Sequence, residues 1–228
     1  MSTLADNLSS IRDRITRGAQ AAGRDPADVR LLAVSKTKPA AAIRELHAAG
    51  VHDFGENYLQ EALTKQQQLI DLPLTWHFIG PIQSNKTKAI AEHFDWVHSV
   101  DRLKIAQRLS EQRPAGLAPL NICLQVNVSG EASKAGCAPA QLPALVTAVA
   151  ALPNLRLRGL MAIPEPTDDR NDQEAAFAQL RQLQDALGLG LDTPSMGMSH
   201  DLEAAIAQGA TWVRIGTALF GARDYGNA

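Results

Sequence analysis

The chain has 228 residues, of which 45% are hydrophobic and 20% are charged, and this composition is typical of a globular protein rather than a disordered or fibrous one. Its 22 Lys and Arg residues nearly balance 24 Asp and Glu residues, for a net charge of −2. This balance provides no general attraction to nucleic acid or an anionic membrane, and no apolar run approaches the about 20 residues of a membrane-spanning helix.

The chain carries only two cysteines, Cys123 and Cys137. Two are too few for a disulfide framework or a cysteine-rich metal site, and the six histidines lack the spacing of a zinc motif. The first residues, Met1 to Asp6, place an acid where a signal peptide has basic residues. We therefore expect a cytoplasmic protein that binds no metal, nucleic acid or membrane.

The apolar pattern switches repeatedly between strand-like and helix-like periods. It predicts a first helix over about residues 4–22, a strand at Leu31–Ser35, and a helix from Pro39 to Ala49. Further strands are predicted at 51–54, 75–79, 96–99, 120–126, 155–160, 192–196 and 212–215. Further helices are predicted at 58–70, 85–93, 102–112, 139–151, 173–187 and 202–208, with a short one from about Ala218.

Each of the eight predicted strands is followed by a helix, which indicates a parallel sheet with helices on its faces. Eight such units in about 200 residues fit a closed barrel. The predicted fold class is therefore α/β, a single (β/α)8 TIM-type barrel domain over 1–228 with an extra N-terminal helix. An open, doubly wound sheet is the alternative.

Lys36 directly follows the first predicted strand, where barrels place their active groups. With a side-chain period of two, Leu32, Val34 and Lys36 share one face, so Lys36 stands at the barrel mouth if Val34 points inward. Burial there would lower the pKa of the lysine and suit it to Schiff-base chemistry. A solvated loop lysine is the alternative.

A second group of candidates lies near the C-terminus, after the seventh and eighth predicted strands. Ser199 is a candidate helix cap, and Gly216 and Thr217 open the last helix, in the loops where barrels commonly bind phosphate. Ordinary capping is the alternative for each. Asp201 and Glu203 must face away from any anion. Alternation along the last strand places Arg214 at the barrel mouth, where a buried guanidinium needs an acceptor.

Three other residues allow two interpretations each. Asn57 is either a helix cap or a polar group that faces the mouth. His77 either lines the mouth or lies in the core, and Cys123, within an apolar strand, is expected in the core.

Together these segments resemble the pyridoxal phosphate (PLP) homeostasis proteins, whose fold matches the barrel domain of alanine racemase. The resemblance runs from Leu31 to about Arg223 and rests on LLAVSKTKP, FGENYLQEA, WHFIGPIQSNK, VHSVD, QVNVSGEASKAG, GLMAIP, SMGMSHDLEAAIAQG and VRIGTALFG.

The resemblance implies that PLP is the cofactor, held by Lys36 as a Schiff base with Asn57 beside it. Ser199, Gly216 and Thr217 would bind its phosphate, and Arg214 would face the pyridine nitrogen. The relatives usually carry an acid where this chain has His200. The family also implies a monomer.

The implied function is to carry or buffer PLP inside the cell, with apo PLP-dependent enzymes as possible partners and without robust catalysis. An arginine at the pyridine nitrogen weakens PLP as an electron sink, and racemisation needs a second acid or base. Tyr58 and Tyr225, the only tyrosines, do not fall where that group is needed. A slow amino-acid racemase is the first alternative. A cofactor-free Schiff-base aldolase is the second.

Overall fold

The computed structural model describes residues 3–131 and 134–221. It begins with helix α1, Leu4–Ala21, as predicted. Thr3 and Asp6 form a reciprocal capping box at its start, which satisfies two backbone donors. Its inner face buries Leu8, Ile11 and Ile15, and the helix packs against α8 and α9 from the other end of the chain.

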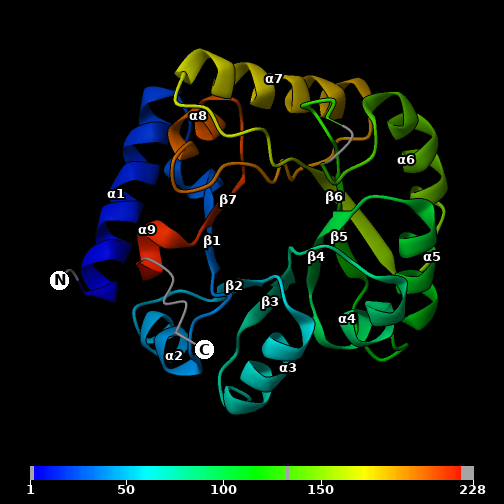
Figure 1. Ribbon diagram of the computed structural model, residues 1–228, viewed down its shortest axis with the longest axis horizontal. Helices are drawn as coiled ribbons and strands as arrows, with labels where there is room; N and C mark the ends of the chain where they lie inside the picture. Colours follow the sequence, from blue (N-terminus) through cyan, green and yellow to red (C-terminus); the bar gives the residue numbers. More distant parts are fainter. Residues whose placement is uncertain (1–2, 132–133, 222–228) are drawn as a thin grey trace.

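A seven-stranded parallel sheet forms the centre of the molecule, in the order β6-β5-β4-β3-β2-β1-β7. In Figure 1 the sheet curls around a central axis, and the helices surround it on the outside. The strands are β1 Arg30–Val34, β2 Asp53–Glu56, β3 Thr75–Phe78, β4 Trp96–Val100, β5 Leu120–Gln125, β6 Leu155–Met161 and β7 Trp212–Ile215.

The helices alternate with the strands as the apolar pattern predicts. They are α2 Ala40–Ala48, α3 Leu59–Gln68, α4 Thr87–His93, α5 Leu103–Gln112, α6 Leu142–Ala150, α7 Arg170–Ala186, α8 Leu202–Ala207 and α9 Thr217–Phe220, with short 3₁₀ turns at Pro26–Asp28, Ser84–Lys86 and Pro139–Gln141. Helix α7 begins three residues before its predicted start because the Asp169 side chain accepts hydrogen bonds from the backbone of Asn171 and Asp172.

The strand predicted at 192–196 is not formed. This segment makes single bridges instead, in which Ser195 pairs with Met161 of β6 and with Trp212 of β7. Pro194 has no backbone N–H and therefore interrupts a continuous ladder, although its carbonyl accepts from Thr211. The described part of the chain is therefore a curled seven-stranded sheet whose edge strands β6 and β7 are linked through this segment.

Apolar side chains pack on both sides of the sheet. The main core lies between the strands and the surrounding helices. Two smaller clusters lie apart from it and consist of Leu32, Val34, Ile79 and Trp212 and of Trp96, Cys123 and Met161. The prediction that Cys123 is a core residue is confirmed, and burial raises the pKa of its thiol to about 12.

Candidate functional site

A cavity of about 270 Å³ opens where the carboxyl ends of the strands meet. This is the end at which parallel α/β folds place their ligands. The six residues that the resemblance assigns to PLP all line it, namely Lys36, Asn57, Ser199, Arg214, Gly216 and Thr217. Lys38, Ile163, Met198, His200 and Gly221 also line it, with Val34 and Ile79 from one of the smaller apolar clusters.

Lys36 reaches the cavity because of its place in the strand alternation. Leu32 and Val34 lie in one apolar cluster, as the inward-facing alternation requires. Strand β1 ends at Val34, and Lys36 follows two residues later as a half-buried side chain on the cavity wall. The structure therefore supports the barrel-mouth position and not that of a fully solvated loop lysine.

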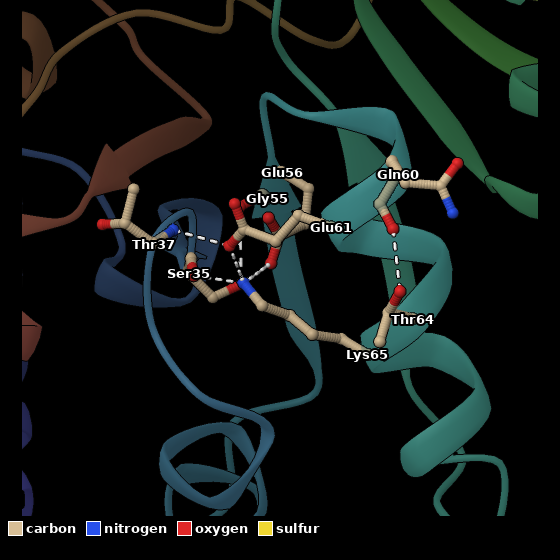
Figure 2. Close-up of polar contacts among 8 residues, drawn as sticks. All are labelled: Ser35, Thr37, Gly55, Glu56, Gln60, Glu61, Thr64 and Lys65. Carbon is tan, nitrogen blue, oxygen red and sulfur yellow. Dashed lines mark hydrogen bonds and ion pairs between the residues drawn. The ribbon is translucent and has the colours of Figure 1, made fainter. Parts of the chain in front are cut away.

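A buried ionic cluster fixes the backbone on both sides of Lys36 (Figure 2). The Lys65 Nζ atom donates to the Ser35 carbonyl at 2.7 Å and to Glu56 Oε1 at 2.8 Å, and it also contacts Glu61. The Ser35 hydroxyl donates to Glu56 Oε1 at 2.6 Å. On the other side, the Thr37 N–H donates to Glu61 Oε1 at 2.6 Å. We call Glu56, Glu61 and Lys65 the loop clamp.

The loop clamp supports a strained backbone at the exposed residue Thr37, whereas its own Lys65–Glu56 pair is buried. Thr37 adopts a φ of 64°, which a β-branched residue rarely takes without outside support. Lys65 is 5% exposed and Glu56 is fully buried. Burial raises the pKa of Glu56, and the neighbouring Lys65 partly offsets that effect. The clamp therefore depends on Lys65 as the cation that compensates a buried carboxylate.

Asn57 follows β2 and presents an unsatisfied acceptor. Its Oδ1 atom is buried and has no hydrogen-bond partner among the described residues. Gly80 lies against its backbone so closely that a Cβ atom there would sit 2.3 Å from the Asn57 carbonyl oxygen. A buried amide oxygen without a partner is costly, so this atom points to a ligand donor. Asn57 does not cap α3, whose N-cap is Tyr58.

Arg214 is buried in the wall of the cavity, as its place in the last strand predicts. Its Nη1 atom donates to Ser195 Oγ at 2.9 Å and its Nη2 atom to the Ala162 carbonyl at 3.0 Å. The protein thus supplies acceptors that the sequence did not reveal. Burial lowers the pKa of the guanidinium to about 10, so it remains charged at neutral pH. The two bonds use two of the five N–H donors of a guanidinium.

Ser199, Gly216 and Thr217 form the side of the cavity next to α9. The Ser199 hydroxyl accepts from the Ala218 N–H at 3.3 Å, in the first turn of α9. The expectation that Ser199 caps α8 is wrong, because Asp201 is the N-cap and its carboxylate accepts from the Met198 N–H.

The acids of α8 face away from the cavity, as expected. Asp201 is buried, and its carboxylate accepts from the Met198 N–H in the loop before α8. Glu203 forms an ion pair with Arg14 of α1 at 2.7 Å. His200 lines the cavity, and its Nε2 atom lies 3.4 Å from Asp201. The negative charges near α8 are therefore engaged outside the cavity.

The structure resolves the two interpretations of His77 in favour of the core. It is fully buried, does not line the cavity, and hydrogen-bonds to Asp53 and His98. Sequence reasoning missed His98 and the loop clamp. Lys65 follows Glu61 by four residues on a helix, which is the usual pattern of a solvated surface pair. Nothing in that spacing signals burial.

Among the residues that the structure describes, no helix is long and apolar enough to cross a membrane. Within the same residues, no group of three or more His, Cys, Asp or Glu side chains is arranged to hold a metal ion.

Comparison with known proteins identifies the family. The family model "Alanine racemase, N-terminal domain" matches residues 7–224. The pyridoxal phosphate homeostasis protein of Pseudomonas aeruginosa is 78% identical over 99% of this chain and 98% of its own length. The protein of the same name from Escherichia coli is 54% identical over 99% of each chain.

Solved structures agree with this assignment. PipY of Synechococcus elongatus, solved with PLP bound, is 42% identical, covers 96% of this chain and 100% of its own, and superimposes with a TM-score of 0.84. Alanine racemase of Corynebacterium glutamicum shares the fold at 19% identity, with a TM-score of 0.65 over 97% of this chain and 62% of its own. The chain therefore belongs to the pyridoxal phosphate homeostasis protein family, built on the alanine racemase N-terminal domain.

Proposed function

We propose that this protein binds PLP in the cavity at the carboxyl ends of the strands and acts in PLP homeostasis by holding and releasing the cofactor. Its relatives bear that name, and PipY has been solved with PLP bound. The observation that carries the proposal is the meeting of a half-buried amine, an unpartnered amide oxygen and a buried guanidinium in one cavity, from Lys36, Asn57 and Arg214.

The lining residues fit the chemical groups of PLP. Bound PLP supplies an aldehyde that captures amines and a ring that withdraws electrons. Lys36 would attach the cofactor covalently as a Schiff base, and Asn57 would accept a hydrogen bond beside it. Ser199, Gly216 and Thr217 would bind the phosphate. Arg214 would face the pyridine nitrogen and, being a donor without a titratable proton at neutral pH, would leave that nitrogen unprotonated.

Two features favour a carrier over an enzyme. A positive guanidinium opposes protonation of the pyridine ring and so weakens the electron sink that amino-acid chemistry needs. Racemisation also needs a second acid or base. Tyr58 is 52% exposed and is absent from the cavity wall, and Tyr225 lies outside the described residues.

The finer expectations form part of the same proposal. We propose one domain over 1–228 that works as a cytoplasmic monomer and gives PLP to apo PLP-dependent enzymes. We also propose that the 192–196 segment takes the place of an eighth strand, so that the sheet acts as a closed (β/α)8 barrel. The single bridges of Ser195 to β6 and β7 support this interpretation.

Three experiments with the purified protein test the proposal. Equilibrium dialysis should find one PLP bound per chain. Mixing the loaded protein with an apo PLP-dependent enzyme should restore that enzyme's activity. Incubation of the loaded protein with single L-amino acids should leave their optical activity unchanged, and turnover near the ~10 per second of a typical enzyme would overturn the carrier function. A protein that binds no PLP, yet cleaves sugar phosphates, would favour the aldolase.

A further inference from the structure

A continuous hydrogen-bonded chain crosses the interior of the sheet and ends at Arg214. Asp53 Oδ1 lies 2.9 Å from His77 Nε2, and His77 Nδ1 lies 2.9 Å from His98 Nε2. His98 Nδ1 then lies 2.7 Å from Ser195 Oγ, which accepts from Arg214 Nη1 at 2.9 Å. These residues come from β2, β3, β4 and β7, which are part of the curled sheet in Figure 1, and from the 192–196 segment.

This series of hydrogen bonds runs from the amino ends of the parallel strands to their carboxyl ends. Asp53 is the first residue of β2, and its carboxylate is 30% exposed at the amino ends of the strands. His77, His98 and Ser195 are each fully buried. Trp96 stacks on the His77 ring at 5.5 Å and 11°, and the Trp212 ring meets it edge-on at 4.9 Å. The two imidazoles are therefore held in place, and solvent reaches this series of hydrogen bonds at Asp53.

The chemistry of the end groups sets the direction of every bond. The Asp53 carboxylate accepts only, so His77 carries its proton on Nε2 and its Nδ1 atom must accept. His98 therefore donates from Nε2, and its Nδ1 atom accepts the hydroxyl proton of Ser195. A guanidinium donates only, so the lone pairs of Ser195 remain for Arg214. Both histidines are then neutral Nε2–H tautomers.

The charges around the two rings favour this neutral arrangement. His77 faces Asp53, Asp95 and Arg30, and His98 faces His77 and Arg214. Burial lowers the pKa of both histidines, and the neighbouring Arg214 charge lowers that of His98 further. Neither imidazole is therefore a cation at neutral pH. Each group from Arg214 through Ser195, His98 and His77 then donates to the next, and the last bond is to Asp53.

We propose that Asp53, His77, His98 and Ser195 form a positioning relay that orients Arg214 in the cavity wall. The carboxylate at one end of the sheet fixes Ser195 as an acceptor at the other. Ser195 and the Ala162 carbonyl together accept from two of the guanidinium N–H groups. These two bonds fix the plane of the guanidinium and so the directions of its remaining N–H groups. Only the role of Arg214 toward PLP rests on the proposed function, and the relay itself consists of this protein's own residues.

The tautomers can be measured without any ligand. In ¹⁵N-histidine-labelled protein at pH 7, long-range ¹H–¹⁵N correlation spectra should show protonated Nε2 and unprotonated Nδ1 atoms for both His77 and His98. A proton on Nδ1 of either ring, or a doubly protonated ring, would overturn the relay. This result does not depend on whether the protein binds PLP.

Substitution of the exposed end tests whether the effect reaches Arg214. In Asp53→Leu the two rings should lose their single tautomer, and the Kd for PLP should rise about two- to tenfold, the range of one neutral hydrogen bond. Asp28→Leu removes an exposed carboxylate just before β1, outside the relay, and should change neither.

The outcomes separate the two proposals. Unchanged tautomers in Asp53→Leu, or changed tautomers with an unchanged Kd for PLP, would overturn the positioning relay. If the wild-type protein binds no PLP, the proposed function fails, while the tautomers of the ligand-free protein still decide whether the carboxylate sets the direction of the chain.

Discussion

At the scale of single residues, the cavity combines groups that the protein satisfies with groups that it leaves for a ligand. Arg214 and Ser199 already have protein partners, whereas Asn57 Oδ1 has none among the described residues. Thr217 is exposed at the start of α9 and adds a hydroxyl. The hydroxyls of Ser199 and Thr217 are therefore two of the side-chain donors that an anion in this cavity would meet.

The double variant Ser199→Ala, Thr217→Ala tests these donors. Hydrogen bonds to a charged group contribute about 1.5–3 kcal/mol each, so noncovalent PLP affinity should fall by roughly two to four decades if the effects add. Covalent attachment and backbone N–H groups will reduce the loss. Competition dialysis against a PLP analogue that lacks the aldehyde measures the noncovalent part.

Thr147→Ala is the control for this variant. It removes a hydroxyl that donates to the Pro143 carbonyl on α6, away from the cavity. Its affinity should equal that of the wild type. Equal affinities for the control and the double variant would show that the two hydroxyls do not bind the phosphate.

At the scale of elements, α3 and β2 together fix the loop between β1 and α2. Lys65 of α3 and Glu56 of β2 meet beneath Ser35, and Glu61 holds the Thr37 N–H (Figure 2). Because Lys36 lies between the two held residues, the loop clamp sets where its side chain enters the cavity. The position of the Lys36 backbone is therefore set by two neighbouring elements.

Lys65→Met should destabilise the protein strongly, because it leaves Glu56 buried without its cation. Breaking a buried pair by removing one partner costs about 3–5 kcal/mol of the free energy of unfolding. Urea denaturation measures this change. The Kd for PLP should rise as well, because the Ser35 carbonyl next to Lys36 loses its donor and Glu61, which holds the Thr37 N–H, loses its cation.

Arg44→Met is the matched control. It removes one partner of an ion pair with Asp71 in which the side chains are 47% and 56% exposed. Solvent screens such a pair, so its loss should change stability much less. If both variants lost the same stability, the loop clamp would not behave as a buried pair.

Most elements could be predicted from the sequence because burial leaves a periodic trace along the chain. The 192–196 segment stands where the helix–strand alternation calls for a strand, but pairing requires N–H donors, and Pro194 lacks one. The cavity residues were predictable because each lies in a predicted strand or in the loop that follows one. Lys65 and His98 were not, since Ser35 and Glu56, which contact Lys65, and His77 and Ser195, which contact His98, lie in other elements. Neither spacing nor composition records burial in three dimensions.

At the scale of the whole molecule, the curled sheet encloses His77 and His98 in their neutral form, and their burial makes the folded protein less stable in acid. Burial lowers the pKa of His77 and His98 below the ordinary value of 6.5. Below pH 6.5 the unfolded chain therefore binds protons that the folded chain does not, and stability falls. Glu56 acts in the opposite direction, because its raised pKa lets the folded chain bind a proton first as the pH falls.

The free energy of unfolding should therefore decrease as the pH falls from 6.5 toward 5. Each histidine contributes a slope of at most about 1.4 kcal/mol per pH unit. Urea denaturation at a series of pH values measures the slope, and His52→Gln, at an exposed position, should retain it. A stability that stays constant or rises over this range would show that the buried histidines are not held neutral.

The central claim is that PLP attaches to Lys36 in the cavity at the carboxyl ends of the strands. Borohydride reduction of the PLP-loaded wild-type protein, followed by digestion and mass mapping of the peptides, tests it most directly. We predict one reduced PLP adduct per chain, on the peptide that contains Lys36. An adduct confined to another lysine, or bound PLP that cannot be trapped by reduction, would contradict it.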